Sequence, residues 1–187
     1  MRLSIGCGAL RLPGFVGVDK YPSPAVDVVH DLTVFPWPFS GDSVDEVRAW
    51  HVLEHMPGYS FPAAVDEIHR ILRPGGVLYV KVPYKEDWAG NPYHVRGFNR
   101  RTFNWWVIDH QSAKEMCLQA ARCRFYRRRQ DVVEVVTGFP WGTLRDVTPG
   151  LIDRFPVLFP RDERDYWSRI PPLMGRQREL REWLVKV

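Results

Sequence analysis

The stretch that decides the fold is Leu3-Ser4-Ile5-Gly6-Cys7-Gly8, followed after residues 9–14 by Phe15-Val16-Gly17-Val18-Asp19. The two short apolar runs predict parallel strands, and open α/β sheets bind ligands beyond the carboxyl ends of such strands. Glycines let backbone N–H groups approach a ligand that a Cβ would push away. A carboxylate at Asp19 suits the two hydroxyls of a ribose. An ordinary tight turn with a solvated aspartate also fits this pattern, so these residues alone leave both interpretations open.

Composition is typical of a soluble single domain of 187 residues, with 45% hydrophobic and 26% charged residues. The net charge of +4 is too small to indicate nucleic acid by itself, although arginines cluster between Arg122 and Arg129. The three cysteines, Cys7, Cys117 and Cys123, show neither metal-site spacing nor a disulfide framework. With no membrane span and no signal-peptide pattern, the expected location is cytoplasmic.

Further strands and one helix follow in the first half. Residues 26–30 predict a third strand ending at Asp31, and residues 44–50 a fourth that leads into His51-Val52-Leu53-Glu54-His55. Apolar spacing predicts a helix over 61–72, ended by Arg73-Pro74-Gly75-Gly76. The apolar run 77–82 is typical of a central parallel strand.

The second half carries weaker signals. Residues 84–99 predict a loop over the site, and 101–122 contain plausible helix with a break at 110–112. A strand is expected within 124–136, an irregular proline-rich excursion over 137–175, and a terminal strand over 179–187.

Taken in order, several motifs resemble the class I S-adenosylmethionine-dependent methyltransferases, especially their short type 11 branch. The matching pieces are Ile5-Gly6-Cys7-Gly8, Gly17-Val18-Asp19, Val29-His30-Asp31-Leu32, Ser43-Val44-Asp45-Glu46-Val47, His51-Val52-Leu53-Glu54-His55 and Glu67 to Gly76. Each is weak alone, but the ordered set is specific. It lies within residues 3–83, a little under half of the chain.

The resemblance implies a Rossmann-like α/β fold whose mostly parallel sheet ends in an antiparallel strand, with S-adenosylmethionine as the cofactor. It places Gly6, Cys7 and Gly8 at the methionine part of the cofactor and Asp19 at the ribose. Asp31 and Leu32 would contact the adenine. His51 would border the sulfonium. Residues 1–83 would then form the cofactor-binding half of one domain, and residues 84–187 the substrate side.

One departure from the family pattern concerns the first crossover. Only residues 9–14 separate the glycine turn from the second strand, whereas parallel neighbours usually need a dozen residues or more. We therefore expect the first crossover helix to be reduced or missing. The chain also offers no lid helix before its first strand, which predicts an open cofactor site. A dinucleotide site is disfavoured, because Arg11 stands where a third glycine is needed.

Candidate bases for the acceptor proton are His51, His55 and His94, with Glu54 an alternative. His51 suits a cofactor neighbour better than a base. A metal is not expected, because Glu54 is misplaced for a zinc-protease helix and Pro57 would interrupt that helix.

The sequence favours a methyltransferase acting on a small-molecule or sugar-like acceptor. Two alternatives stay open: a cofactor-binding protein of the same fold with weak or no turnover, and an RNA methyltransferase that uses the cluster from Arg122 to Arg129. A homodimer is compatible with the aromatic second half.

Overall fold

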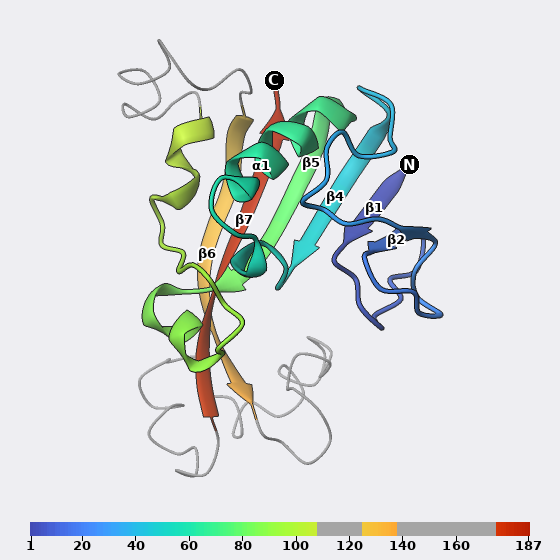
Figure 1. Ribbon diagram of the computed structural model, residues 1–187. Coiled ribbons are helices and arrows are strands. Elements are labelled where there is room, and N and C mark those ends of the chain that lie inside the picture. Colours follow the sequence, from blue (N-terminus) through green and yellow to red (C-terminus); the bar gives the residue numbers. More distant parts are fainter. Residues whose placement is uncertain (108–124, 138–174) are drawn as a thin grey trace, which may run out of the picture.

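The structure is a computed structural model that describes residues 1–107, 125–137 and 175–187. Within these ranges the chain forms one seven-stranded sheet in the order β3-β2-β1-β4-β5-β7-β6 (Figure 1). The strands are β1 (Arg2–Ile5), β2 (Val16–Asp19), β3 (Val28–Val29), β4 (Val44–Trp50), β5 (Leu72–Pro83), β6 (Phe125–Thr137) and β7 (Gly175–Lys186).

Strand direction confirms the predicted fold class. Strands β1 to β5 pair in parallel, whereas β7 runs antiparallel between β5 and β6. In Figure 1 the arrows of β1, β4 and β5 point the same way and the arrow of β7 points the opposite way. The carboxyl ends of β1, β2 and β4 therefore meet at one edge of the sheet, where ligands of such folds bind.

The first crossover contains no helix. Residues 6–15 link β1 to β2 through turns, as the short spacing predicted. The strands they join are tightly packed: Leu3 pairs with Val16, and a Cβ on Gly17 would lie 2.0 Å from the carbonyl oxygen of Ala25. Glycine at position 17 lets the chain after β2 cross this close to the strand.

The helix α1 (Ser60–Ile71) confirms the predicted helical segment. It covers one face of the sheet (Figure 1), and its apolar side chains Phe61, Ala64, Val65, Ile68 and Ile71 are buried. Its end at Ile71 agrees with the predicted end at residue 72 to within one residue, but the strand that follows begins earlier than the predicted 77. Leu72 adopts extended backbone and pairs with Val44, so β5 begins there, and the register shift between Val44 and Glu46 takes up the residues around Gly75.

Other boundaries differ from the prediction in extent. The third strand is confined to two residues, because Val26 is turned by a bond from its N–H to the Ser23 carbonyl. Of the helix expected over 101–122, residues 102–106 form a 3-10 helix, η3 (Thr102–Trp106), and residues 108–122 lie outside the described residues. Strands β6 and β7 confirm the two strands expected near the end, while the excursion over 138–174 lies outside the described ranges.

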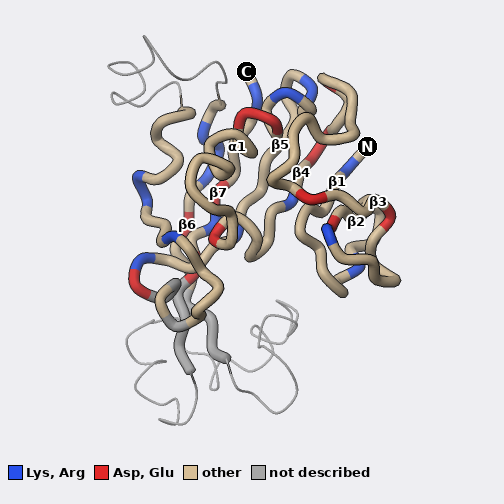
Figure 2. Tube along the Cα trace, viewed as in Figure 1, with Lys and Arg blue, Asp and Glu red and all other residues tan. Residues whose placement is uncertain are grey.

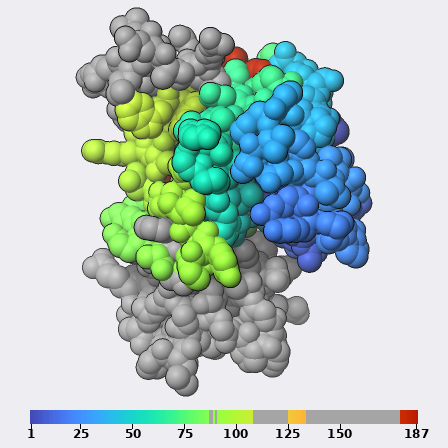
Figure 3. Space-filling view, in the orientation of Figure 1, coloured from blue at the N-terminus to red at the C-terminus, as the bar shows by residue number. Residues whose placement is uncertain are grey.

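Residues 84–107 pack against α1 (Figure 3). Their first part forms η2 (Lys85–Gly90), and the rings of Phe98, Phe103 and Trp106 surround Phe61 at centroid distances of 5.4 to 6.0 Å. This aromatic cluster holds residues 84–107 against helix α1. None of the helices in the described residues is long and apolar enough to cross a membrane.

Candidate active site

A cavity of about 550 Å³ opens beyond the carboxyl ends of β1, β2 and β4. Cavities of this size commonly hold small ligands and cofactors. It is lined by Gly6, Asp19, Lys20, Tyr21, Asp31, Leu32, Thr33, His51, Val52, His55, Met56 and Tyr93. The structure thus brings six of the sequence-predicted site residues around one space. Cys7, Gly8 and His94 are not among the lining residues, although the ring of His94 contacts that of His55.

The glycine turn after β1 is held in a conformation that suits glycine. Gly6 has φ +59°, and a Cβ there would lie 2.3 Å from Cγ2 of Val52. Gly8 has φ +55° with open space around it. Between them, Cys7 points into the protein, and burial together with the nearby Asp19 raises the pKa of its thiol. Cys7 therefore acts as a small buried side chain, because a protonated thiol is a poor nucleophile.

Two carboxylates face the cavity from the ends of β2 and β3. Asp19 accepts the N–H of Gly8 at 2.8 Å and the N–H of Tyr21 at 3.0 Å, which fixes both of its oxygens. Asp31 accepts the N–H and the hydroxyl of Thr33, and these bonds hold its pKa below the usual range. Each carboxylate keeps lone pairs for further donors, such as sugar hydroxyls or an exocyclic amine.

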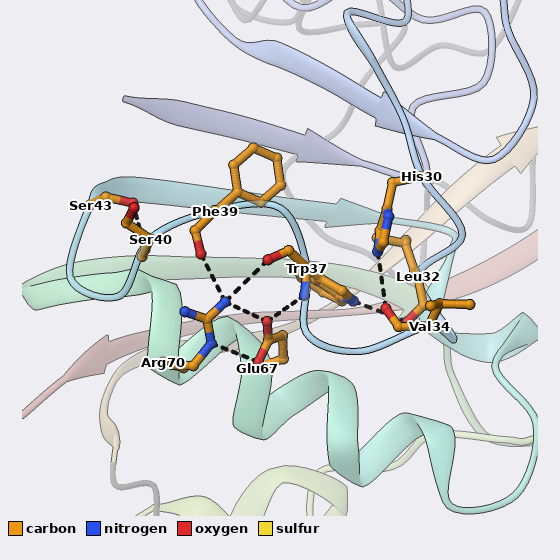
Figure 4. A network of polar contacts seen from close by, with 9 residues as sticks. All are labelled: His30, Leu32, Val34, Trp37, Phe39, Ser40, Ser43, Glu67 and Arg70. Atoms are coloured by element: carbon orange, nitrogen blue, oxygen red, sulfur yellow. Dashed lines mark hydrogen bonds and ion pairs between the residues drawn. The ribbon is translucent and has the colours of Figure 1, made fainter.

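A buried network supports the wall at Leu32 (Figure 4). The carbonyl of Leu32 accepts the indole N–H of Trp37 at 3.1 Å, and the N–H of Trp37 donates to Glu67 at 2.7 Å. Arg70 holds both oxygens of Glu67 and the carbonyl of Phe39. Helix α1 thereby positions the loop that carries Leu32 to the cavity.

We expect Glu67→Gln to lower the free energy of unfolding at pH 7 by about 1–2 kcal/mol, because the charge-assisted bonds to Arg70 are lost while one acceptor for Trp37 remains. Burial raises the pKa of Glu67, but the bonds from Arg70 and Trp37 outweigh burial, so its folded pKa lies below normal. A lowered folded pKa stabilises above the unfolded pKa, about 4.3. The difference between wild type and variant should therefore begin to shrink as pH falls below that value, and it should be lost only once pH has passed below the folded pKa.

Chemical denaturation between pH 3 and pH 8 measures this difference. Glu46→Gln is the matched control, because Glu46 pairs with Arg48 while partly exposed on β4, and such pairs contribute little. A Glu67→Gln penalty that stays constant down to pH 3 would contradict the assigned network.

His51 stands between two buried carboxylates at the end of β4. Its Nδ1 lies 3.2 Å from Oε1 of Glu54 and its Nε2 lies 3.0 Å from Oε1 of Glu179, and these glutamates are 0% and 2% exposed. Its backbone has φ +51°, a left-handed conformation that costs a non-glycine residue about 1–3 kcal/mol. Because both ring nitrogens contact carboxylates, this arrangement orients the ring at the cavity rather than leaving a nitrogen for a substrate proton.

His55 and His94 form a second cluster at the same edge. Their rings meet edge to face at 4.7 Å, and Nε2 of His94 lies 4.0 Å from Oε1 of Glu54. The loop that carries His94 is fixed to the 3-10 turn η1 (Leu53–His55) through the N–H of Val95, which donates to the carbonyl of Glu54. Arg96 secures it further by donating to the carbonyls of Met56 and Gly58.

Sequence reasoning missed several members of the site. Glu179 enters from β7 with no motif around it, and Tyr93 lines the cavity from a loop. The sequence suggested Glu54 only as an alternative base. Among the described residues it contacts His51 and His94 instead. The only sequence signal for Glu54 as a site residue was its position shortly after the fourth strand.

The arginine cluster is only partly described. Arg122 and Arg124 lie outside the described residues, whereas Arg127 pairs with Glu182 and Arg129 with Asp131. Acidic and basic segments are interspersed on the two last strands (Figure 2). These pairs leave less positive charge for a phosphate backbone than the sequence run suggested.

A carboxylate beside a glycine turn at the carboxyl ends of parallel strands is typical of nucleotide-binding α/β domains. The chain matches the methyltransferase domain family over residues 4–130. It is 37% identical over 83 residues to a probable S-adenosylmethionine-dependent methyltransferase of Mycolicibacterium smegmatis. That match covers 41% of this chain and 31% of the relative, so it spans about a third of the relative's length.

Solved structures share the fold. The 1,6-didemethyltoxoflavin-N1-methyltransferase of Burkholderia thailandensis, crystallised with its substrate and S-adenosylhomocysteine, aligns over 100% of this chain and 70% of its own, with TM-score 0.54 and 14% identity. The Bacillus subtilis YcgJ protein aligns over 99% and 91%, with TM-score 0.52 and 14% identity. The chain therefore belongs to the methyltransferase domain family, the class I enzymes whose cofactor is S-adenosylmethionine.

Proposed function

We propose that this protein transfers the methyl group of S-adenosylmethionine to a hydroxyl of a small, sugar-like acceptor. The observation that carries the proposal is the division of the cavity. Asp19, Asp31 and Leu32 line it from the ends of β2 and β3, whereas His51, His55 and Tyr93 line it from the end of β4, from η1 and from the loop beyond η2. Strand β1 lies between β2 and β4 in the sheet, so the two groups come from opposite sides of it. The first group offers acceptors for a ribose and an adenine, and the second offers the imidazole of His55 where an acceptor proton must be removed.

In the proposed reaction the acceptor oxygen attacks the methyl carbon in line with the sulfonium. The new C–O bond forms as the S–C bond breaks, the electron pair returns to sulfur, and the proton of the acceptor hydroxyl is released to solvent. Holding the two reactants in line is worth roughly 7–11 kcal/mol. Buried Glu54 and Glu179 place negative charge beside His51, at the end of the cavity that we assign to the cationic sulfonium. We assign residues 84–187 to the acceptor side.

Calorimetric titration of the purified protein tests the cofactor, and mass spectrometry over a panel of polyols, sugars and phenols tests the transfer. We expect S-adenosylmethionine and S-adenosylhomocysteine to bind with micromolar dissociation constants, and an acceptor from the panel to gain one methyl group. Absence of binding at millimolar cofactor would refute the proposal.

A cofactor-binding protein without turnover is the second candidate, because the crossover from β1 to β2 contains no helix to cover the cofactor. It predicts tight cofactor binding with no product from any acceptor.

If RNA is the acceptor, binding of RNA should weaken steeply as the salt concentration rises. The proposal instead predicts weak RNA binding, since Arg127 and Arg129 have acidic partners. We place the reaction in the cytoplasm, where Cys7 stays reduced. A homodimer is compatible with the proposed reaction.

A further inference from the structure

Three side chains with metal-binding atoms converge at the acceptor end of the cavity. A carboxylate oxygen of Glu54 and one ring nitrogen each of His55 and His94 lie within 4.8 Å of one another. Glu54 and His55 belong to η1, while His94 comes from the loop after β5. His55 lines the cavity, so a ligand held by this cluster would be accessible from it.

The buried carboxylate of Glu54 gives an independent indication of a missing partner. Glu54 is 0% exposed, and its Oε2 accepts no hydrogen bond from the residues that the structure describes. Leaving a buried polar atom unpaired costs roughly 1–3 kcal/mol, and more when it is charged. A cation bound at this oxygen would remove that cost.

The orientation of His55 fits a ligand role. Its Nδ1 lies 3.0 Å from the carbonyl oxygen of Tyr93, so Nδ1 carries the proton and donates to that carbonyl. The lone pair is then on Nε2. Histidine ligands usually donate their other N–H to a carbonyl or carboxylate, which fixes the tautomer and the ring.

We infer that Glu54, His55 and His94 bind one divalent transition-metal ion of the Zn²⁺, Co²⁺ or Mn²⁺ class. Two imidazoles and one carboxylate form a ligand set that zinc and its neighbours accept, with at least one position open, whereas Mg²⁺ and Ca²⁺ prefer oxygen ligands. Bonds of about 2.0–2.2 Å place such ligands about 3–4 Å apart. The cluster therefore has to contract by about 1 Å on binding, which side-chain rotation of the exposed His55 can supply.

The catalytic role of this ion rests on the proposed function. An acceptor hydroxyl bound at the open position loses its proton more easily, because the cation stabilises the alkoxide. The proton leaves to solvent, the alkoxide attacks the methyl carbon, and the S–C electron pair returns to sulfur. Charge balances without a protein base, which matches a site where both nitrogens of His51 contact carboxylates.

The sequence argument against a metal considered only helical spacing between His51 and His55. The structure supplies a different set, because His94 is brought in from 39 residues further along the chain than His55 and was expected only as a substrate-loop base. The lack of a local metal motif in the sequence is therefore compatible with a metal site built from distant residues.

The test uses the full chain after removal of metals with a chelator. Equilibrium dialysis against Zn²⁺, Co²⁺, Mn²⁺ or Mg²⁺, followed by elemental analysis, should give one ion per chain for Zn²⁺ and Co²⁺ and much weaker Mg²⁺ binding. His55→Gln and His94→Gln should each weaken Zn²⁺ and Co²⁺ binding at least tenfold. His30→Gln is the matched control and should bind as wild type does, because His30 contacts the carbonyl of Val34 away from the cluster.

Separate readouts distinguish failure of this inference from failure of the proposed function. Cofactor binding should persist in the metal-free protein and in His94→Gln, whereas methyl transfer should fall and return when Zn²⁺ or Mn²⁺ is added. Lack of Zn²⁺ and Co²⁺ binding at millimolar concentration, or binding equal in all variants, overturns the metal site whatever the cofactor does. If a variant does not fold, ¹⁵N spectra of wild type decide, since Zn²⁺ must shift the ring nitrogens of His55 and His94 and leave those of His30 unchanged.

Discussion

Asp19→Ala should weaken S-adenosylmethionine binding by a factor of about 10²–10⁴. A charge-assisted hydrogen bond contributes about 1.5–3 kcal/mol, and we propose that the carboxylate accepts two from the ribose. The substitution also releases the N–H groups of Gly8 and Tyr21 that Asp19 now holds. Isothermal calorimetry with S-adenosylmethionine measures the loss.

Asp27→Asn is the matched control for this change. Asp27 likewise accepts a backbone N–H, from Gly17 at 2.8 Å, and pairs with Arg11, but it does not line the cavity. The control should bind the cofactor within twofold of wild type. Asp19→Asn keeps one acceptor and loses the charge, so about a tenfold loss is expected.

A change in the ligand separates ribose recognition from a general disturbance of the turn. Wild type should bind an S-adenosylhomocysteine analogue without the ribose 2′-hydroxyl at least tenfold more weakly than the parent compound. Asp19→Ala should bind the two equally, because its partner for that hydroxyl is gone. If Asp19→Ala still discriminates between them, the assignment of Asp19 to the ribose is wrong.

How far the sequence predicts this molecule depends on the range of each interaction. Strands β1, β2 and β4 and helix α1 follow from local apolar periodicity, and the absent crossover helix follows from counting residues between Gly8 and Phe15. The start of β5 was misplaced because pairing of Leu72 with Val44, a tertiary contact, begins the strand before the residues that predicted a turn.

The acceptor end of the site was beyond local patterns. Glu179 reaches His51 from β7 across 128 positions, and His94 joins Glu54 through a loop fixed by Arg96. No spacing rule describes such contacts, because they depend on β7 inserting between β5 and β6. The convergence of Gly6, Asp19 and Asp31 on one cavity was predictable, because the strands that carry them follow one another in the sequence.

Gly6→Ala should abolish cofactor binding and lower the free energy of unfolding by about 2–5 kcal/mol. An alanine in the left-handed conformation of Gly6 costs about 1–2 kcal/mol, and overpacking adds about 1–3 kcal/mol. The new Cβ would lie 2.3 Å from Cγ2 and 2.6 Å from Cβ of Val52, so Val52 must move. Val52 directly precedes η1, which carries Glu54 and His55.

Gly8→Ala isolates the conformational cost. Gly8 has almost the same φ, but a Cβ there meets nothing within 4 Å, so only about 1–2 kcal/mol should be lost.

Denaturant unfolding of both single variants, and of double variants at Val52, measures these losses. Val52→Ala should not rescue Gly6→Ala, because the Cβ of residue 52 remains. Val52→Gly removes both clashing atoms, so a favourable coupling free energy is expected. Equal losses at Gly6 and Gly8 would show that backbone conformation alone, and not the contact with Val52, requires glycine after the first strand.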